Sequence, residues 1–377
     1  MPSQPTKILQ IVPRLSPDVD GVGDYTLSLA HELRDRYQIH SDFLVVRPSE
    51  RTQPTVDGFT VHRLMTHSVA GLLDRVPANI STVVLQYSNY PYLLGKVDAP
   101  AWLVAALMRL KQRGIRILIM FHEFPTLQYQ RVRLPNPIQR RVSRGLAQVA
   151  DIVVTNNAAF QHTLATWTNT PVHCIPNFST IGEVQQVLPL HDRDRALIIF
   201  GSTDRGRIYR SNLEGVQRIC QQLNIHTLYD IGHPIDWDSS SLDADITVIK
   251  TGLLPATAVS KLMFTAFAGI FDYRRFPNNL AKSTVYAAYC AHGLLPLCNL
   301  RSLPPQDGIL ADRHYLDTHT LHQHTDRTTE SLSSFQRIAD NAHAWYNTHT
   351  LAKCAAQYAS FFSLPQPQLS PSARDYD

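Results

Sequence analysis

The sequence lacks a hydrophobic run long enough to span a membrane. Its longest apolar stretch, residues 101–108, is far shorter than the roughly 20 apolar residues that a transmembrane helix needs. The N-terminus also lacks the basic region followed by a long apolar segment that marks an exported protein. We therefore expect a cytoplasmic location.

Cysteine is scarce, with five residues in 377, and no two of them stand at the spacing of a metal site. Each lies in or near an apolar stretch, which favours buried thiols in a reducing compartment over disulfides or metal ligands. The five are Cys174, Cys220, Cys290, Cys298 and Cys354.

Acidic clusters are few as well. Three Asp-x-Asp pairs, one of them Asp18 and Asp20, lie in polar stretches, and their scatter indicates chance. We therefore expect neither a metal site nor a cofactor. Neither sign of charge dominates, because 35 Lys+Arg stand against 31 Asp+Glu, and we expect no nucleic-acid partner. The positive excess lies in residues 1–175, with 18 Lys+Arg against 12 Asp+Glu.

Strand-like apolar runs alternate with amphipathic stretches along the whole chain, a pattern typical of doubly wound α/β domains. A charged joint at residues 191–195 separates two such series, which predicts two Rossmann-like domains facing across one cleft. We expect strands at 8–12, 43–46, 59–64, 82–86, 115–121, 151–155, 172–175, 196–200, 227–231, 246–249, 270–271 and 295–297. We expect helices at 25–36, 101–113, 138–149, 159–167, 212–223, 256–267, 284–291 and 330 to about 362.

The stretch 268–299 organises the second series. A strand leads through a polar loop to a helix that opens with Lys282, Ser283 and Thr284. A helix N-terminus has unpaired N–H groups and a positive dipole end, so this turn suits a diphosphate. The alternative is an ordinary capped helix in a parallel sheet.

An arginine-rich loop follows the first strand of the same series. It carries Ser202, Arg205, Arg207 and Arg210, and guanidinium groups match phosphate oxygens in charge and geometry. If it meets the helix start described above, the two segments would hold a diphosphate from both sides. The alternative is a solvated basic loop.

The first strand–helix turn of the chain contains Gly21 and Gly23, followed by Asp24 and Tyr25. Two glycines directly before a helix let the backbone approach a ligand closely, which favours contact with a sugar or another polar group. The alternative is a flexible connection. The sequence is not GxGxxG.

Polar residues also follow two other strands of the first series. His122 and Glu123 come directly after one, at the edge where ligands of α/β sheets bind, and we interpret His122 as a hydrogen-bond donor or proton-transfer group. Gln86, Tyr87 and Tyr90 come at the end of another and are predicted to line the acceptor side, although packing aromatics are nearly as well supported.

Together these motifs resemble those of the GT-B glycosyltransferases, particularly the retaining group called family four. The resemblance rests on the turn that begins at Val12-Pro13, the His122 that follows a strand, the "ad-x-vv" stretch 150–155, and the segment Ile175-Pro176-Asn177. It covers nearly the whole chain with loose motifs.

The resemblance implies that the two domains bind different substrates. The N-terminal domain, 1–190, would bind the acceptor, and the C-terminal domain, 191–345, would bind the donor diphosphate through basic residues of the arginine-rich loop. A helix at 346–364 would return to the N-terminal domain, ahead of a disordered tail at 365–377. It also implies retention of anomeric configuration.

The sequence departs from the family at the donor segment. Two glutamates are usual there, and the corresponding positions hold Leu280 and Ala288, neither of which can accept a side-chain hydrogen bond. The leading hypothesis is a metal-independent hexosyltransferase of polysaccharide biosynthesis that uses a nucleotide diphosphate sugar and a glycan or lipid-linked acceptor. The alternatives are a non-catalytic or weakly active relative that partners another transferase, and a nucleotide-sugar epimerase.

Five arginines lie close together in the first series, with no acidic residue among them. They favour either a solvated helix face or a contact with anionic lipid at the inner face of the membrane. They are Arg131, Arg133, Arg140, Arg141 and Arg144.

Overall fold

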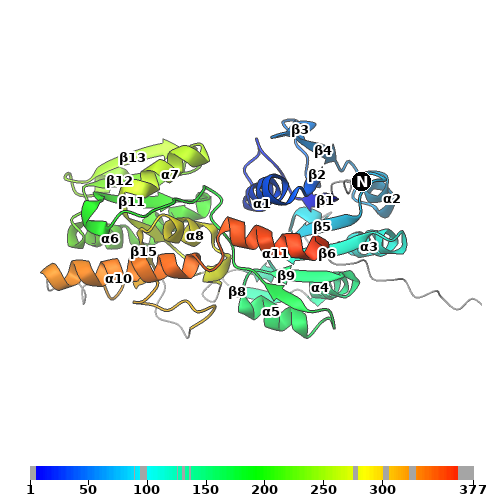
Figure 1. Cartoon of the computed structure of the whole chain (residues 1–377). Coiled ribbons are helices and arrows are strands. Elements are labelled where there is room, and N and C mark those ends of the chain that lie inside the picture. Colours follow the sequence, from blue (N-terminus) through cyan, green and yellow to red (C-terminus); the bar gives the residue numbers. More distant parts are fainter. Residues whose placement is uncertain are drawn as a thin grey trace, which may run out of the picture. The chain divides into compact units, whose positions relative to one another are not determined.

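The computed structural model describes residues 6–88, 90–93, 100–124, 126–129, 132–135, 137–274, 279–299, 305–321 and 328–363. The chain forms two compact units. Unit 1 comprises Met1–Asn156, Phe160–Ile175 and Leu351–Asp377, and unit 2 comprises Asn157–Ala159 and Pro176–Thr350. Each unit has a sheet with helices packed on it, as Figure 1 shows. Among the described helices, none is both long and apolar enough to cross a bilayer.

The sheet of unit 1 has the strand order β10-β9-β6-β5-β1-β2-β4-β3. Every neighbouring pair is parallel except β3 and β4. The strands are β1 (Lys7–Val12), β2 (His40–Val45), β3 (Thr55–Val56), β4 (Phe59–Arg63), β5 (Thr82–Tyr87), β6 (Arg116–Phe121), β9 (Ile152–Thr155) and β10 (Val172–Cys174). Because β5 and β6 are buried on both faces, their sequences are largely apolar and do not alternate between apolar and polar residues.

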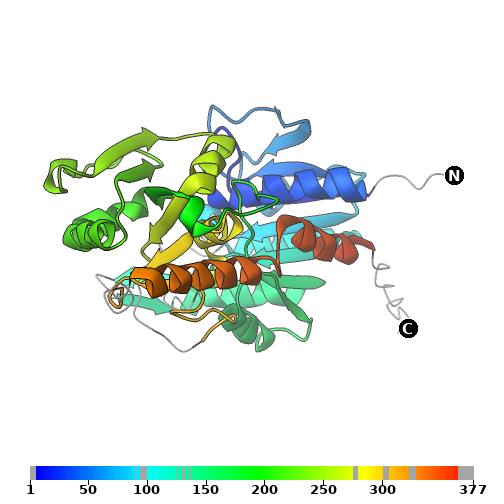
Figure 2. The same cartoon turned by 60° about the vertical axis from the view of Figure 1, so that its left-hand side comes forward.

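The helices of unit 1 connect these strands. They are α1 (Gly21–Tyr37), α2 (Val69–Leu73), α3 (Ala101–Gln112), α4 (Pro137–Val149), α5 (Ala158–Ala165) and α11 (Leu351–Ser363). A hairpin of β7 (Thr126–Tyr129) and β8 (Val132–Pro135) precedes α4. The red α11 lies beside the blue α1 in Figure 2, and these two helices are in contact.

Helix α1 begins four residues before the predicted start. The Asp20 carboxylate accepts hydrogen bonds from the N–H groups of Val22, at 3.0 Å, and Gly23, at 2.9 Å, and so caps the helix. The two glycines of the first turn therefore belong to the helix, whereas the sequence predicted them before it.

The sheet of unit 2 is entirely parallel, in the order β13-β12-β11-β14-β15-β16. Its strands are β11 (Asp194–Phe200), β12 (Thr227–Ile231), β13 (Thr247–Gly252), β14 (Ala266–Phe271), β15 (Leu295–Cys298) and β16 (Leu316–Asp317). Its helices are α6 (Gly206–Gln222), α7 (Ala256–Thr265), α8 (Thr284–Ala291) and α10 (Thr328–Tyr346).

The C-terminal helical segment is divided, whereas the sequence predicted one helix. Helix α10 ends at Tyr346 and α11 starts at Leu351, after four residues outside any helix. Two of these four, Thr348 and Thr350, are β-branched, which lowers helix propensity. The division separates the aromatic residues of the segment, because the ring of Tyr346 lies in unit 2 and that of Tyr358 in unit 1. The predicted disordered tail lies outside the described residues.

Candidate functional site

Both sheets reverse their strand order at one point. In unit 2 the order reverses between β11 and β14, and in unit 1 between β1 and β5. Ligands of open α/β sheets bind beyond the carboxyl ends of the strands at such a switch point. In unit 2 the loops flanking this point carry the predicted donor-binding residues. In unit 1 they carry the glycine turn and Tyr87.

His122 follows β6 in unit 1 and ends a buried row of polar side chains. Its Nε2 lies 2.8 Å from Oε1 of Gln86, whose Nε2 donates to Oε1 of Gln10 at 3.0 Å. The row continues from Nε2 of Gln10 to Oγ of Ser41 at 3.0 Å. All four residues are buried, and they come from, or directly follow, four adjacent strands of the sheet. We call this row the amide ladder.

The amide ladder determines which nitrogen of His122 carries the proton. Because each amide donates away from His122, Oε1 of Gln86 is left to accept, and the neutral imidazole must present an Nε2–H to it. Its Nδ1 then holds the lone pair. The ring also packs edge-on against Tyr25, with centroids 5.1 Å apart, and Asn156 donates to the His122 carbonyl. Sequence reasoning missed Gln10 and Ser41, because nothing local marks a buried polar residue in an apolar strand.

Asp24, in the first turn of α1, is the carboxyl group of this edge that titrates near neutrality. Burial, with the nearby charge of Asp20 as a smaller cause, raises the pKa of Asp24 to about 6 from its ordinary 3.8. Gly21, three residues earlier, has no heavy atom within 4 Å of the position that a Cβ would occupy. A ligand can therefore approach the backbone there. Glu123 is half-buried beside His122.

The other predicted acceptor-side residues serve the packing of unit 1. A Cβ on Gly23 would lie 2.2 Å from the carbonyl oxygen of Arg14, so this glycine admits protein backbone, whereas the prediction assigned it to a ligand. Tyr25 is buried and its hydroxyl bonds that of Tyr358, and Tyr87 is buried with its hydroxyl 3.3 Å from that of Ser143. Tyr87 therefore matches the packing alternative, and Tyr25 is a core residue, which differs from both the ligand contact and the flexible connection considered for its turn. Gln86 is fully buried in the amide ladder, and the side chain of Tyr90 lies outside the described residues.

In unit 2, Arg205 is an internal residue. Its side chain is 3% exposed and its Nε donates to Oδ1 of Asp230 at 2.6 Å. Its remaining nitrogens donate to the carbonyl oxygens of Gly201, Ser202 and His233. The guanidinium therefore shapes the loop after β11, and this geometry differs from the exposed phosphate ligand that the sequence predicted.

The other two arginines of this segment, Arg207 and Arg210, lie in helix α6, which begins six residues before its predicted start, and they are more accessible. Arg207 is partly exposed and pairs with Asp204 at 2.8 Å, and Ser202 caps the short turn 203–205 through the N–H of Asp204. Arg210 is exposed, and its guanidinium lies about 3 Å from where a Cβ of Gly206 would stand, over the first turn of α6. Both cations therefore lie near the start of α6 in unit 2.

The start of α8 lies against this loop. A Cβ on Gly201 would meet Cγ2 of Val285 at 3.3 Å, so the loop after β11 and the first turn of α8 are in contact. Ser283 caps α8 by accepting from the N–H of Tyr286. The structure therefore brings together the two segments that the sequence assigned to the diphosphate.

Asn177, of the Ile-Pro-Asn segment, fixes the approach to α8. Its backbone N–H donates to the carbonyl oxygen of Ala281, and its side-chain amide donates to that of Lys282 at 2.7 Å. Lys282 is partly exposed, as is Thr284, one residue past the cap. This segment therefore holds the turn that presents Lys282.

The positions of the missing glutamates lie in the core of unit 2. Leu280 is 7% exposed and Ala288 is 1% exposed. A polar residue that the sequence reasoning did not select lies at the switch point: Arg274, after β14, donates to both carboxylate oxygens of Asp272, and its side chain is 45% exposed. In the part of the chain that the structure describes, no group of three or more metal-ligating side chains occurs.

Comparison with known proteins gives a fold and no sequence relative. No protein-family model and no curated protein matches the sequence. Solved structures do match over almost their full length. TarM has 7% identity and a TM-score of 0.62, over 95% of this chain and 99% of that chain. The lipopolysaccharide outer core galactosyltransferase WaaB, in its apo form, has 11% identity and a TM-score of 0.57, over 95% of this chain and 100% of that chain.

An alpha-glucosyltransferase in complex with UDP and a 13-mer DNA containing a HMU base also matches, at 10% identity and a TM-score of 0.54, over 94% of this chain and 98% of that chain. These proteins are GT-B glycosyltransferases. The chain has the GT-B fold. The predicted fold class, two α/β sheets of mostly parallel strands with flanking helices, is thereby confirmed.

Proposed function

We propose that the protein is a glycosyltransferase that moves a hexose from a nucleotide diphosphate sugar to a hydroxyl group of a glycan or lipid-linked acceptor. The observation that carries the proposal is the contact, at the switch point of unit 2, between the loop after β11 and the start of α8. This contact supports the proposal, because ligands of open α/β sheets bind at the switch point and two cationic segments that meet there suit a diphosphate. The galactosyltransferase and alpha-glucosyltransferase among the similar structures support the reaction class.

The diphosphate would be bound by Arg207, Arg210 and Lys282, with the first amides of α8 beyond the Ser283 cap and with Ser202 and Thr284 at the edges. As the sugar–phosphate bond breaks, negative charge develops on the diphosphate, and fixed cations stabilise that charge more than they stabilise the bound donor. Such a site needs no metal. Arg205 would act indirectly, because its hydrogen bonds hold the carbonyl groups of this loop.

Unit 1 would bind the acceptor and the transferred sugar. The amide ladder would keep His122 in one orientation, ready to hydrogen-bond a sugar hydroxyl, with Glu123 beside it. Asp24, with its pKa near 6, is suited to accept the proton that the acceptor hydroxyl loses. By resemblance to family four we expect the reaction to retain the anomeric configuration. We expect a cytoplasmic protein of polysaccharide biosynthesis that contacts the inner face of the membrane.

A second function has one specific observation in its favour. Leu280 and Ala288 are buried where the resembling family carries donor-binding glutamates, and the carboxylates nearest the switch point are engaged, Asp230 by Arg205 and Asp272 by Arg274. A relative that binds a nucleotide or glycan without transfer, as the partner of another transferase, would fit these features.

The deciding experiment incubates the purified protein with uridine, guanosine and adenosine diphosphate sugars, with and without glycan acceptors. Release of nucleoside diphosphate together with a new glycosidic product supports transfer, whereas binding without release supports the partner function. Release of a changed nucleotide sugar would indicate an epimerase.

The diphosphate site has its own test. The double variant Lys282→Ala, Arg210→Ala should weaken nucleoside diphosphate binding at least tenfold and leave the fold intact, because both side chains lie at partly or fully exposed positions. Arg218→Gln, a change at an exposed arginine further along α6, is the matched control. Equal affinity in the double variant and the control would reject the site.

A further inference from the structure

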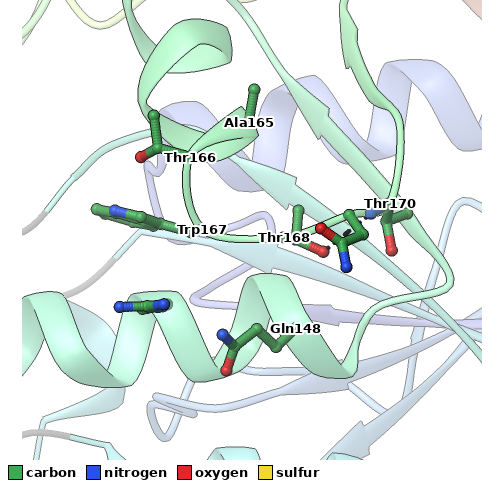
Figure 3. A pocket seen from close by; sticks show the side chains of 8 residues that line it. Gln148, Ala165, Thr166, Trp167, Thr168 and Thr170 are labelled. Atoms are coloured by element: carbon green, nitrogen blue, oxygen red, sulfur yellow. Dashed lines mark hydrogen bonds between the residues drawn. The ribbon is translucent and has the colours of Figure 1, made fainter.

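Two hollows of about 420 Å³ each flank α4, and they share one lining residue, Gln148. The first lies between the second half of α4 and the loop 165–170. Figure 3 shows the side chains of Thr166, Trp167 and Thr168 extending from that loop and Gln148 extending from the helix. The second lies between α3 and α4. Both hollows belong to unit 1.

These hollows are remote from the site described above. Helix α4 ends where β9 begins, and the loop 165–170 leads into β10, so both elements meet at the amino ends of the strands. His122 follows the carboxyl end of β6. The two hollows therefore lie at the opposite edge of the sheet of unit 1 and are separate from any donor or acceptor site there.

The first hollow is polar and cationic. Arg144 is the charged residue of its lining, and Arg140 adds a second cation 5.5 Å from the centroid of the Trp167 ring. The loop side is pre-organised, because Thr168 accepts from the N–H of Thr170, whose own hydroxyl donates to the carbonyl oxygen of Ala150. Guanidinium groups beside hydroxyl and amide groups suit a phosphate that carries further hydroxyl groups.

The second hollow is mostly apolar. Val104, Met108 and Val149 line it, and the side chain of Met108 is 50% exposed and so accessible to a ligand. Gly145, on the α4 side, lets Val104 of α3 pack closely on the helix, since a Cβ there would lie 3.4 Å from that side chain. At the rim, the charge of Lys111 is neutralised by Asp151 at 2.7 Å. This hollow suits an alkyl chain.

We propose that the paired hollows bind one anionic amphiphile, with its phosphate-bearing head beside Arg144 and its hydrocarbon chain beside Met108. The occupant is a lipid, because the arginines beside the first hollow complement a phosphate, the apolar lining of the second suits a hydrocarbon chain, and the two hollows adjoin at Gln148. The site goes beyond the proposed transfer reaction, since binding here requires no nucleotide sugar. It would hold the protein on an individual anionic lipid.

The test uses a lipid that stays monomeric, dihexanoyl phosphatidic acid, with binding measured by isothermal titration calorimetry. The wild type should bind it at least tenfold more tightly than it binds glycerol 3-phosphate, which has the head alone. Arg144→Gln and Met108→Ser should each weaken the lipid at least fivefold, and Met108→Ser should leave glycerol 3-phosphate binding unchanged. Arg218→Gln, at an exposed position in unit 2, is the control.

Three results would overturn the proposal. Equal affinity for the lipid and for glycerol 3-phosphate would show a head-group site only. Unchanged lipid affinity in both variants would place the lipid elsewhere. Binding to phosphatidic acid vesicles without binding to the monomeric lipid would show a surface charge effect only. Nucleoside diphosphate binding, measured on the same variants, should stay at the wild-type value, so failure here is distinguishable from failure of the proposed function.

Discussion

Arg205 ends the short turn after β11 and Arg207 lies in the first turn of α6, so the two residues stand close together but have opposite environments. The first is buried against Asp230, whose second oxygen accepts from Nε1 of Trp237 at 3.0 Å, whereas the second forms a partly exposed pair with Asp204. A buried charge that loses its partner is strongly destabilising, but an exposed pair contributes little. We therefore expect Arg205 to contribute to the stability of the fold and Arg207 to contribute to ligand binding.

This contrast gives the first prediction. Arg205→Met should lower the free energy of unfolding by about 3–5 kcal/mol, because Asp230 loses its cation in a buried position. Arg207→Gln should change stability by less than about 1 kcal/mol and should weaken nucleoside diphosphate binding. Urea unfolding and calorimetric titration of both variants measure the two effects. Similar stability of the two variants would show that the Arg205 pair has no structural role.

Asp24 gives a prediction about pH. Its pKa in the folded protein, about 6, is above its ordinary 3.8, so the folded state favours the protonated form and stability falls as the pH rises through this window. Asp24→Asn removes this effect and should raise the free energy of unfolding at pH 7 by about 1–3 kcal/mol. The gain should disappear below pH 3.8, as urea unfolding at several pH values would show. A gain that is the same at all pH values would contradict this assignment.

At the scale of the elements, α11 is attached to unit 1 through a few buried side chains. Its Tyr358 is fully buried with its hydroxyl 3.4 Å from that of Tyr25, and Arg116 of β6 donates to the Phe361 carbonyl at 2.7 Å. Tyr25 in turn packs on His122. The last helix therefore supports α1 where α1 contacts the candidate site.

The corresponding prediction compares two changes at one position. Tyr358→Ala should destabilise unit 1 by about 3–5 kcal/mol, because it leaves a large cavity under α1. Tyr358→Phe keeps the ring and removes only the long hydroxyl contact, so it should cost no more than about 1.5 kcal/mol. Thermal unfolding of both proteins provides the comparison. If the alanine variant were as stable as the phenylalanine variant, α11 would not be part of the core.

Helices and strands could be predicted from the sequence where the local pattern of apolar and polar residues determines them. Strands buried on both faces, such as β5 and β6, are largely apolar, and their predicted ends lie within one residue of the observed ends. Short elements such as α2, β3 and β16 carry too few residues for a pattern. The start of α1 was missed because a single capping side chain, Asp20, sets it.

The candidate site was predictable only in its outline. A residue that directly follows a strand, such as His122 after β6, lies at the carboxyl edge of the sheet whatever the tertiary details, whereas Lys282 and Arg210 were selected for their charge. The burial of Arg205 could not be foreseen, because it depends on Asp230, which is 25 residues away in the chain. Tyr87 and Gln86 at a strand end proved to point into the core.

Positive charge is concentrated in residues 1–175 of the chain, and we expect it to favour contact with an anionic membrane surface. Arg140, Arg141 and Arg144 are exposed on α4, while Arg131 and the side chain of Arg133 lie outside the described residues. Changing the three exposed arginines to Gln should abolish salt-sensitive co-sedimentation with anionic vesicles, because each basic residue near such a surface contributes about 1 kcal/mol.

The control for this experiment removes the same charge elsewhere. Arg218, Arg313 and Arg337 are exposed residues of unit 2, and changing all three to Gln lowers the net charge equally. The control should still sediment with anionic vesicles at low salt, and neither protein should sediment with neutral ones. Equal sedimentation of the two triple variants would leave α4 as a solvated helix face.

The amide ladder has a consequence for folding as well as for His122. The central strands of unit 1 are rich in Val, Ile and Leu, and hydrophobicity alone would tolerate several alignments of neighbouring parallel strands. A shift of β1 by one residue would turn Gln10 to the opposite face and leave two buried amides without partners, at a cost of about 1–3 kcal/mol for each. The ladder thus penalises misaligned sheets. A chain that has folded with the wrong strand alignment would also lack the acceptor that orients its histidine, so the same three hydrogen bonds select the correct sheet and the competent site together.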